Sequence, residues 1–337
     1  MDPAARRVFG GRKRSGALAA AVVLAVVIVT ALALGGGGRR HTSTRTDRPV
    51  AQLAAPGSLF PVNGLFAAGG LDTADAVAGR ADIGSDRSIH FANPAVSISG
   101  RLEYLAAFPP YCWNGSCAST NHCSGGCQLV QLSSPLSIDA LPDSAWAKAK
   151  SANDDASIDW GANTTYAPGT AEVSSSANDR SITIPGGTYY FCDVSFDGSA
   201  ITLRTTGTAA NPVVIYIDSP ARPGSGCAPG SGRLAGANSF TLANASGVAS
   251  NLQIYLYGDP RTCAPSKSGF DPSRYCPDDL SPNSTSMTAD VYAPFSSARF
   301  GGPMTITGQM DIGYLTANND LTLRYQGPAP TNAHRVS

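Results

Sequence analysis

The feature that most constrains this fold is a short apolar alternation that recurs along most of the chain. Two to four apolar residues stand at every second position, and Gly, Pro, Asp or Asn then interrupts them. Because successive side chains of a β-strand point to opposite faces, each segment predicts a short strand with one buried face. The apolar positions are Ile89/Phe91, Val96/Ile98, Ile182/Ile184, Tyr190/Cys192/Val194/Phe196, Ile201/Leu203, Val213/Ile215/Ile217, Leu252/Ile254/Leu256, Met287/Ala289/Val291, Met304/Ile306, Met310/Ile312 and Leu321/Leu323.

Short strands joined by turns of uneven length predict an all-β fold of stacked coils. In a parallel β-helix, each coil buries its inner apolar residues against the next coil. The alternative is a β-sandwich or jelly roll, whose antiparallel strands are joined by hairpins. Asn-Gly turns between alternating runs are scarce, and Asn114-Gly115 lies in a cysteine-rich segment instead. We therefore favour the parallel β-helix.

Residues 15–34 form an uncharged, largely apolar run of twenty residues. A helix of that length, at about 1.5 Å per residue, crosses the ~30 Å hydrocarbon core of a bilayer. The alternative is a cleavable signal peptide, because Ala31-Leu32-Ala33 offers a cleavage site, but the apolar region of such peptides spans only ~7–15 residues. We predict a retained transmembrane signal anchor.

The basic residues are concentrated around this apolar run. The first fifty residues hold nine Lys and Arg against two Asp, which leaves 15 basic and 22 acidic residues in the remainder. A mildly acidic remainder lacks the basic field that attracts phosphate backbones, so we expect no nucleic-acid partner. Five of the nine precede the apolar run, which favours a cytoplasmic location for residues 1–14.

The rest of the chain divides by composition. Residues 35–60 mix Gly, Thr, Arg and Pro without apolar periodicity, which is typical of a flexible stalk. Residues 61–326 form the predicted extracytoplasmic β domain, and residues 327–337 a disordered tail. Within the domain, residues 143–152 predict a short helix, since Asp143 or Ser144 can cap its first turn and Trp146 and Ala149 share a face.

Eight cysteines, all beyond the apolar run, indicate an oxidising compartment. An even number behind an export signal predicts up to four disulfides, which also favours an extracellular C-terminal domain. The candidates are Cys112, Cys117, Cys123, Cys127, Cys192, Cys227, Cys263 and Cys276.

Four of these cysteines lie in the segment 112–127, which is too rich in Gly, Ser and Asn to bury a core of its own. We interpret it as a cross-linked surface loop. The alternative, a zinc site that includes His122, lacks the C-x2-C pairs that orient thiolates tetrahedrally. Cys263 and Cys276 bracket a polar segment suited to a closed loop, which would leave Cys192 and Cys227 as the remaining pair; spacing alone does not fix the connectivity.

Several segments resemble an uncharacterised domain at the C-terminus of bacterial envelope proteins. They are Ile184–Phe191, residues 211–218, residues 251–255, residues 291–294 and Gly308, with weaker likeness at 82–102 and 141–152. In that family a pilus-assembly-like membrane segment precedes a right-handed β-helix of unassigned function. The resemblance therefore implies a right-handed coil over residues 180–326.

One departure from that family concerns the N-terminal membrane segment. No acidic residue lies between Arg14 and Leu34, whereas pilin-like segments carry a glutamate after the processing site. We therefore expect a plain anchor rather than incorporation into a pilus fibre.

No motif in the sequence indicates a particular reaction. β-Helix enzymes that cleave polysaccharide group aspartates with Ca²⁺ or a basic residue on one face, because the reacting centre needs charge stabilisation and a proton acceptor. The candidates are Asp154, Asp155, Asp193, Asp197, Asp278, Asp279 and Asp311. Their positions beside Gly and Pro favour a role in turns, so we predict no catalytic residue.

The histidines and the glycine-rich turns do not indicate a metal, nucleophile or phosphate site either. His41, His90, His122 and His334 are too scattered for a metal pair or a nucleophile triad, and the Gly-rich turns lack the Lys-Ser/Thr of a phosphate-binding loop. We therefore expect neither cofactor nor metal.

A row of tyrosines could present rings to a carbohydrate, although stacked coils also align identical residues for packing, the interpretation we favour. The row contains Tyr189, Tyr190, Tyr216, Tyr255, Tyr257 and Tyr292.

The hypothesis that follows is a non-catalytic structural or adhesive β-helix protein of the cell envelope. It would be held in the cell membrane by residues 15–34, with the lipid bilayer and envelope polysaccharide or pilus-like proteins as partners. The alternative is a surface-anchored lyase or hydrolase acting on polysaccharide. An enzyme should bring at least three Asp, Arg or Lys side chains together in one groove, whereas a structural module should disperse them.

Overall fold

The computed structural model describes residues 64–113, 115–117, 127–136, 140–176, 180–199, 201–238, 240–263, 276–282 and 286–327. The predicted segments 1–14, 15–34 and 35–60, most of the loop 112–127 and the tail beyond Gly327 lie outside these residues. Among the residues described, no helix is long and apolar enough to cross a membrane.

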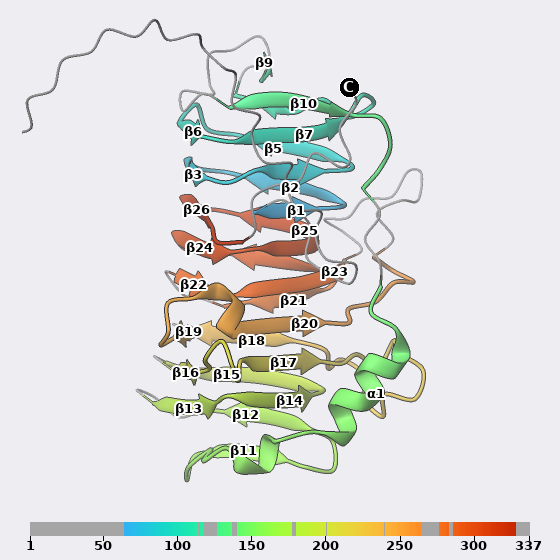
Figure 1. The fold of residues 1–337 in the computed structure, drawn as a ribbon, viewed down its shortest axis with the longest axis vertical. Coiled ribbons are helices and arrows are strands. Elements are labelled where there is room, and N and C mark those ends of the chain that lie inside the picture. Colours follow the sequence, from blue (N-terminus) through green and yellow to red (C-terminus); the bar gives the residue numbers. More distant parts are fainter. Residues whose placement is uncertain are drawn as a thin grey trace, which may run out of the picture. The chain divides into compact units, whose positions relative to one another are not determined.

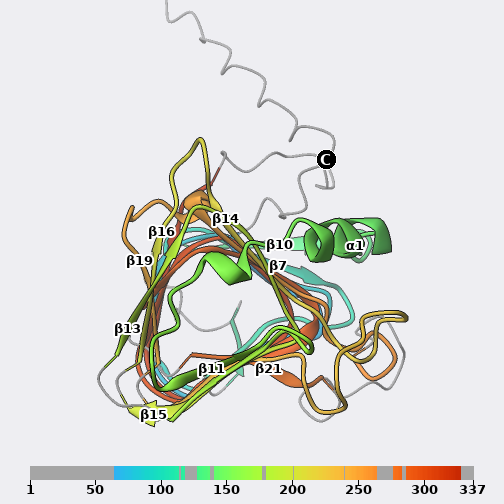
Figure 2. The same ribbon diagram turned by 90° about the horizontal axis from the view of Figure 1, so that it is seen from below.

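The described part is an all-β fold whose strands pair almost entirely in parallel (Figure 1). Seen along the stack, the strands form three sides (Figure 2). In the described residues only β11 (Thr164–Ala167) with β12 (Glu172–Ser175), and β8 (Tyr111–Cys112) with β9 (Gly115–Ser116), pair antiparallel. The parallel pairing confirms the all-β parallel fold and does not agree with the sandwich alternative.

Each side of the stack is a ladder of parallel strands from successive coils. The first ladder contains β14 (Gly187–Phe191), β17 (Val213–Ile217), β20 (Leu252–Leu256), the first parts of β23 (Asp290–Phe300) and β25 (Met310–Ala317), then β1 (Leu65–Ala67), β4 (Ile83–Ser85), β7 (Arg101–Leu105) and β10 (Gln128–Leu132). The second contains β12, β15 (Asp193–Ser199), β18 (Leu234–Asn238), β21 (Asp278–Ser281), the last parts of β23 and β25, then β2 (Gly70–Thr73), β5 (Ser88–Phe91) and β8. The third contains β13 (Ser181–Pro185), β16 (Thr202–Thr206) and β19 (Thr241–Asn244), followed by β22 (Ser286–Thr288), β24 (Met304–Gly308), β26 (Leu321–Tyr325), β3 (Val77–Arg80) and β6 (Val96–Ile98).

The coils do not stack in chain order. The last coil lies directly beside the first: Met310 pairs with Leu65, Leu315 with Leu71 and Leu321 with Val77. In Figure 1 the blue strands β1 to β3 therefore lie on the red strands β24 to β26, in the middle of the stack. The two ends of the described chain meet inside one continuous ladder.

A connection along the outside of the stack makes this order possible. After β10 at one end, the chain reaches α1 (Asp143–Ser151) and a short 3-10 helix (Asp155–Ser157), and enters the opposite end at β11 (Figure 1). A second 3-10 helix, Ala249–Asn251, precedes β20. Helix α1 ends one residue before the predicted segment. The β11–β12 hairpin was not predicted, since its sequence is polar and aperiodic.

The core is a column of apolar side chains that point inward from all three ladders. In β17, Val213, Ile215 and Ile217 are buried, and Ile254 and Leu65 are wholly buried at other levels of the same ladder. Backbone hydrogen bonds link each coil to the next while apolar burial stabilises the interior, at roughly 25 cal/mol per Å². This arrangement explains why two or three alternating apolar residues per strand suffice.

Three disulfides join described cysteines, as the even cysteine count predicts. They are Cys112–Cys117, Cys192–Cys227 and Cys263–Cys276. The last two pairs are those that the loop argument suggested. Cys127 is also disulfide-bonded. Sulfurs engaged in disulfides do not provide the thiolates that the zinc alternative needs.

Candidate binding surface

The aspartates singled out as catalytic candidates serve separate local structures. Asp155 is fully buried near the β11 end, where its carboxylate accepts hydrogen bonds from the Tyr190 backbone N–H and the Tyr166 hydroxyl, both at 3.1 Å. Burial raises the pKa of Asp155 to about 6. Its neighbour Asp154 accepts a hydrogen bond from the Thr188 N–H. These two residues fix the turn into the first complete coil.

The remaining candidates lie on other coils. Asp193 pairs with Arg233 at 3.3 Å, and buried Asp279 accepts a hydrogen bond from the Ser296 hydroxyl at 2.8 Å. Asp197 is exposed, and the side chain of Asp278 lies outside the described atoms. The structure therefore does not bring the predicted candidates together.

Asp311 differs from the other candidates because it is buried without a hydrogen-bond partner for its Oδ1 atom in the described structure. Burial raises its pKa well above the usual value, and the nearby carboxylate of Asp86 raises it further. Burial also raises the pKa of Asp86 to about 6, although the Leu136 N–H donates a hydrogen bond to it. Through this hydrogen bond Asp86 holds the segment that leaves β10.

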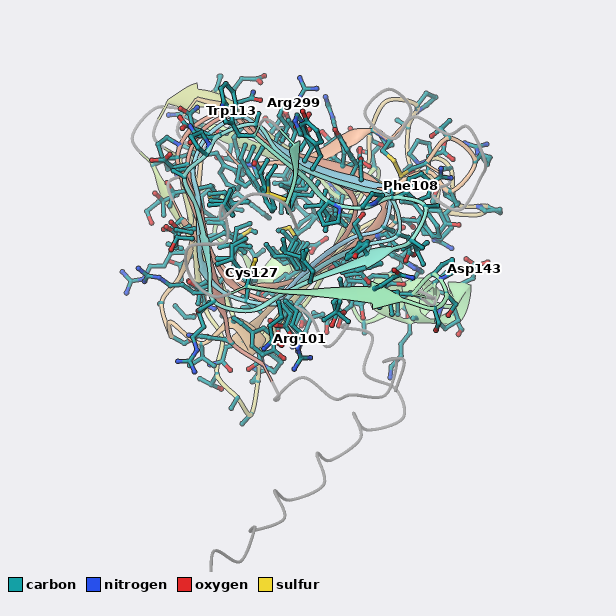
Figure 3. The ribbon with its side chains drawn as sticks, turned by 90° about the horizontal axis from the view of Figure 1, so that it is seen from above. Arg101, Phe108, Trp113, Cys127, Asp143 and Arg299 are labelled. Carbon is teal, nitrogen blue, oxygen red and sulfur yellow. A yellow bond between two sulfur atoms is a disulfide. The ribbon has the colours of Figure 1, made fainter. Side chains whose placement is uncertain are left out.

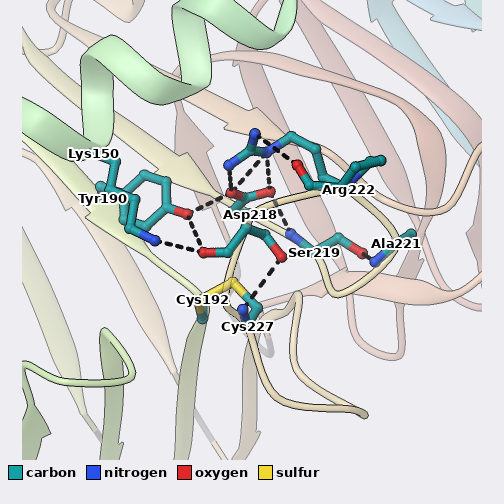
Figure 4. A network of polar contacts seen from close by, with 10 residues as sticks. Lys150, Tyr190, Cys192, Asp218, Ser219, Ala221, Arg222 and Cys227 are labelled. Carbon is teal, nitrogen blue, oxygen red and sulfur yellow. Dashed lines mark hydrogen bonds and ion pairs between the residues drawn. A yellow bond between two sulfur atoms is a disulfide. The ribbon is translucent and has the colours of Figure 1, made fainter.

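One cluster of charged side chains does converge, and the sequence did not predict it (Figure 4). Arg222 donates to both carboxylate oxygens of Asp218, with its closest nitrogen at 2.6 Å, and the Tyr190 hydroxyl donates to the same carboxylate. Lys150 of α1 donates to the Ser225 carbonyl at 2.6 Å. The only hint in the sequence was an Asp and an Arg four residues apart within a Pro- and Gly-rich loop.

This cluster is a structural connection rather than a reaction centre. The Asp218 and Arg222 side chains are 0% and 5% exposed, so substrate has no route to the carboxylate. Both oxygens already accept hydrogen bonds from Arg222, and the Ser219 N–H donates to Oδ1. The Cys192–Cys227 disulfide beside it closes the same loop. Together these contacts hold the loop and the end of α1 against the stack.

The predicted row of tyrosines is largely covered. Tyr216 and Tyr255 stack at 4.9 Å on adjacent strands, and Tyr292 follows on the next coil. Trp146 of α1 lies over them with its ring 5.4 Å from that of Tyr216. Tyr189 points into the core and is wholly buried. The packing interpretation of this row agrees with the structure.

The aromatic side chains that solvent does reach lie elsewhere, at the β10 end of the second ladder. Tyr111 and Trp113 are 50% and 46% exposed, and Val248 is the other large apolar side chain exposed to this degree in the described residues. Tyr111 in β8 and Trp113 in the turn that follows it are both exposed, while Cys112 between them is buried. Figure 3 shows Trp113 at the outer edge, on the same side of the stack as Arg299.

Polar groups continue this aromatic surface along the ladder. His90 pairs in register with both Tyr111 and Asp72. The Nδ1 atom of His90 lies 2.9 Å from the Asp72 carboxylate, and its ring is 5.4 Å from that of Tyr111. We call Asp72, His90, Tyr111 and Trp113 the outer aromatic surface. It combines ring faces with hydrogen-bonding groups, the combination that binds sugar rings. His41, His122 and His334 lie outside the described residues.

No protein-family model, curated protein or solved structure matches this chain. Among the described residues, no group of three or more His, Cys, Asp or Glu side chains could hold a metal ion.

Proposed function

We propose that this chain is a non-catalytic structural and adhesive protein of the cell envelope, whose stack is a right-handed parallel β-helix that contacts envelope polysaccharide. The observation that carries the proposal is the outer aromatic surface, where Tyr111 and Trp113 stay about half exposed. Exposed rings stack on the apolar faces of sugars, and the Asp72–His90 pair beside them offers hydrogen-bonding groups to hydroxyls.

The distribution of charge supports binding rather than catalysis. Asp218–Arg222 is buried and saturated with hydrogen bonds, while Asp193–Arg233 and Asp259–Arg261 are isolated pairs on other loops. A polysaccharide lyase or hydrolase would need such groups in one groove open to the substrate. The dispersal of these charges favours the structural role over the enzymatic alternative.

The location in the envelope rests on the sequence. The uncharged run 15–34 has the length of a membrane span, and the disulfides fit an oxidising compartment. We propose a single-pass anchor in the cell membrane with the β domain outside.

The test is co-sedimentation of the full-length protein, in mild detergent, with insoluble bacterial cell-wall polysaccharide. We expect the wild type to sediment with the polysaccharide and a Tyr111→Ala/Trp113→Ala variant to lose about 90% or more of the bound fraction, since two stacking contacts of about 1 kcal/mol each are removed. Val248→Ala is the matched control, because it removes an equally exposed apolar side chain that has no ring.

Two outcomes would count against the proposal. Equal sedimentation of the double variant would show that the outer aromatic surface is not the contact. Release of new reducing ends or unsaturated sugars from the polysaccharide would establish the enzymatic alternative.

A further inference from the structure

A second site lies on another side of the stack, where the beginning of α1 lies beside the end of β20 and the middle of β23. A cavity of about 320 Å³ opens there, within the range of small-molecule sites. Its walls are mostly rings: Trp146, Tyr257, Tyr292 and Phe295, together with Pro142 and further prolines. Asp143 stands at the same cavity, and Figure 3 places it away from Trp113.

The aromatic walls meet at a steep angle. The rings of Trp146 and Tyr257 are 5.5 Å apart with an interplanar angle of 80°. At this distance the edge of one ring packs on the face of the other, so the two rings form one aromatic wall. Exposed ring surface on such a wall attracts cations through its quadrupole.

Trp146 lines the cavity but is almost wholly buried. Its side chain is 1% exposed and its Nε1 atom is inaccessible, so a ligand in the cavity does not contact the indole N–H. Tyr257 and Phe295 are only partly buried, and they supply the ring surface that the cavity presents.

The charge around the cavity is unbalanced in the direction that favours a cation. The Asp143 carboxylate has no ion pair within the described residues. The neighbouring charges neutralise one another, since Arg222 pairs with Asp218 and Arg261 with Asp259. One negative charge therefore remains beside a set of aromatic rings.

We propose that this cavity binds an organic ammonium ion. The ammonium group lies between the Tyr257 ring and the Asp143 carboxylate, and the carbon skeleton packs on Tyr257 and Phe295. Amino sugars and choline-type amines share this chemistry. This site is separate from the outer aromatic surface. A negative result for ammonium binding can therefore be distinguished from a negative result for polysaccharide binding.

Isothermal titration of the full-length protein tests the proposal with four probes. Glucosamine and choline carry the ammonium group, whereas glucose and N-acetylglucosamine are neutral. We expect at least one ammonium probe to bind about tenfold or more tighter than both neutral sugars. Preference for glucosamine would identify an amino sugar as the source, and preference for choline a quaternary amine. The proposal would be overturned if the charged and neutral probes bind equally, or if neither ammonium probe binds at 50 mM. That concentration is set by the ~mM affinity expected of a small exposed site.

Three variants separate recognition from folding. Asp143→Asn should weaken binding of the ammonium probe about fivefold or more, while Asp320→Asn, an exposed carboxylate on β26's preceding turn, should leave it unchanged. Tyr257→Leu removes the partly exposed ring and should weaken binding of the ammonium probe about fivefold or more. Circular dichroism melts verify that each variant folds. Full affinity in a folded Asp143→Asn variant would contradict the proposal.

Discussion

Leu323 in the last coil and Gly79 in the first coil are register partners, although they come from opposite ends of the chain. A Cβ atom added to Gly79 would collide with the backbone carbonyl of Leu323, and the φ angle of Gly79, +144°, is one that residues with side chains rarely adopt. This close approach occurs where β26 and β3 complete the third ladder. The joint between the two ends of the chain depends on a residue without a side chain.

Gly79→Ala is therefore expected to lower the free energy of unfolding by about 2–4 kcal/mol, through backbone strain and displacement of β26. Chemical denaturation followed by circular dichroism measures the change. Gly302→Ala is the matched control, because nothing lies within 4 Å of its added Cβ atom. Equal midpoints for the two variants would contradict the tight joint described above.

Replacing Arg222 by Met is expected to destabilise the protein by about 3–5 kcal/mol, since it leaves the buried Asp218 carboxylate without its partner. The comparison is Arg261→Met, which breaks a pair whose arginine is 70% exposed and should cost far less stability, because solvent screens the pair. Urea denaturation of both variants measures the difference. An equal loss in the free energy of unfolding for both variants would show that burial does not determine how much each ion pair stabilises the protein.

Removal of the Cys192–Cys227 disulfide by a double alanine substitution is expected to cost about 4 kcal/mol, because it closes a loop of 35 residues in the unfolded chain. The Cys112–Cys117 disulfide has a separation of only 5 residues, so the same substitution there should cost about 2 kcal/mol. Thermal unfolding without reductant tests this ranking, and the reverse order would contradict it.

Asp311→Asn is expected to change how stability depends on pH. Burial and Asp86 raise the pKa of Asp311 in the folded state, so the folded protein binds this proton more tightly than the unfolded chain, where Asp titrates near ~3.9. The stabilisation is complete below that value and is lost as pH rises through the raised folded pKa. The variant should therefore gain stability relative to the wild type between pH 5 and pH 8.

Denaturation midpoints at pH 5, 6, 7 and 8 check this trend, with Asp320→Asn as the control because its carboxylate is exposed. Parallel pH profiles for wild type and Asp311→Asn would contradict the raised pKa of Asp311 in the folded state.

Most residues of the candidate site could not be predicted from the sequence. The tyrosines of the first ladder were correctly assigned to packing, but the cover supplied by Trp146 depends on where α1 crosses the stack. Tyr111 and Trp113 were not singled out, since exposure of a ring depends on what the rest of the chain leaves uncovered. Their i, i+2 spacing around the buried Cys112 was the available signal. Asp218 and Arg222 were missed because their pairing depends on burial of a loop.

The sequence by itself determined the local structure: alternating apolar residues and turn residues make short strands such as Val213–Ile217, and an even set of cysteines makes disulfides. Those outcomes follow from the period of the strand and the chemistry of each side chain. Only the tertiary structure decided the order of the coils. An inward Leu65 can pack on any apolar coil, and it lies beside Met310 because the outer connection through α1 carries the chain to the far end of the stack before the last coils form.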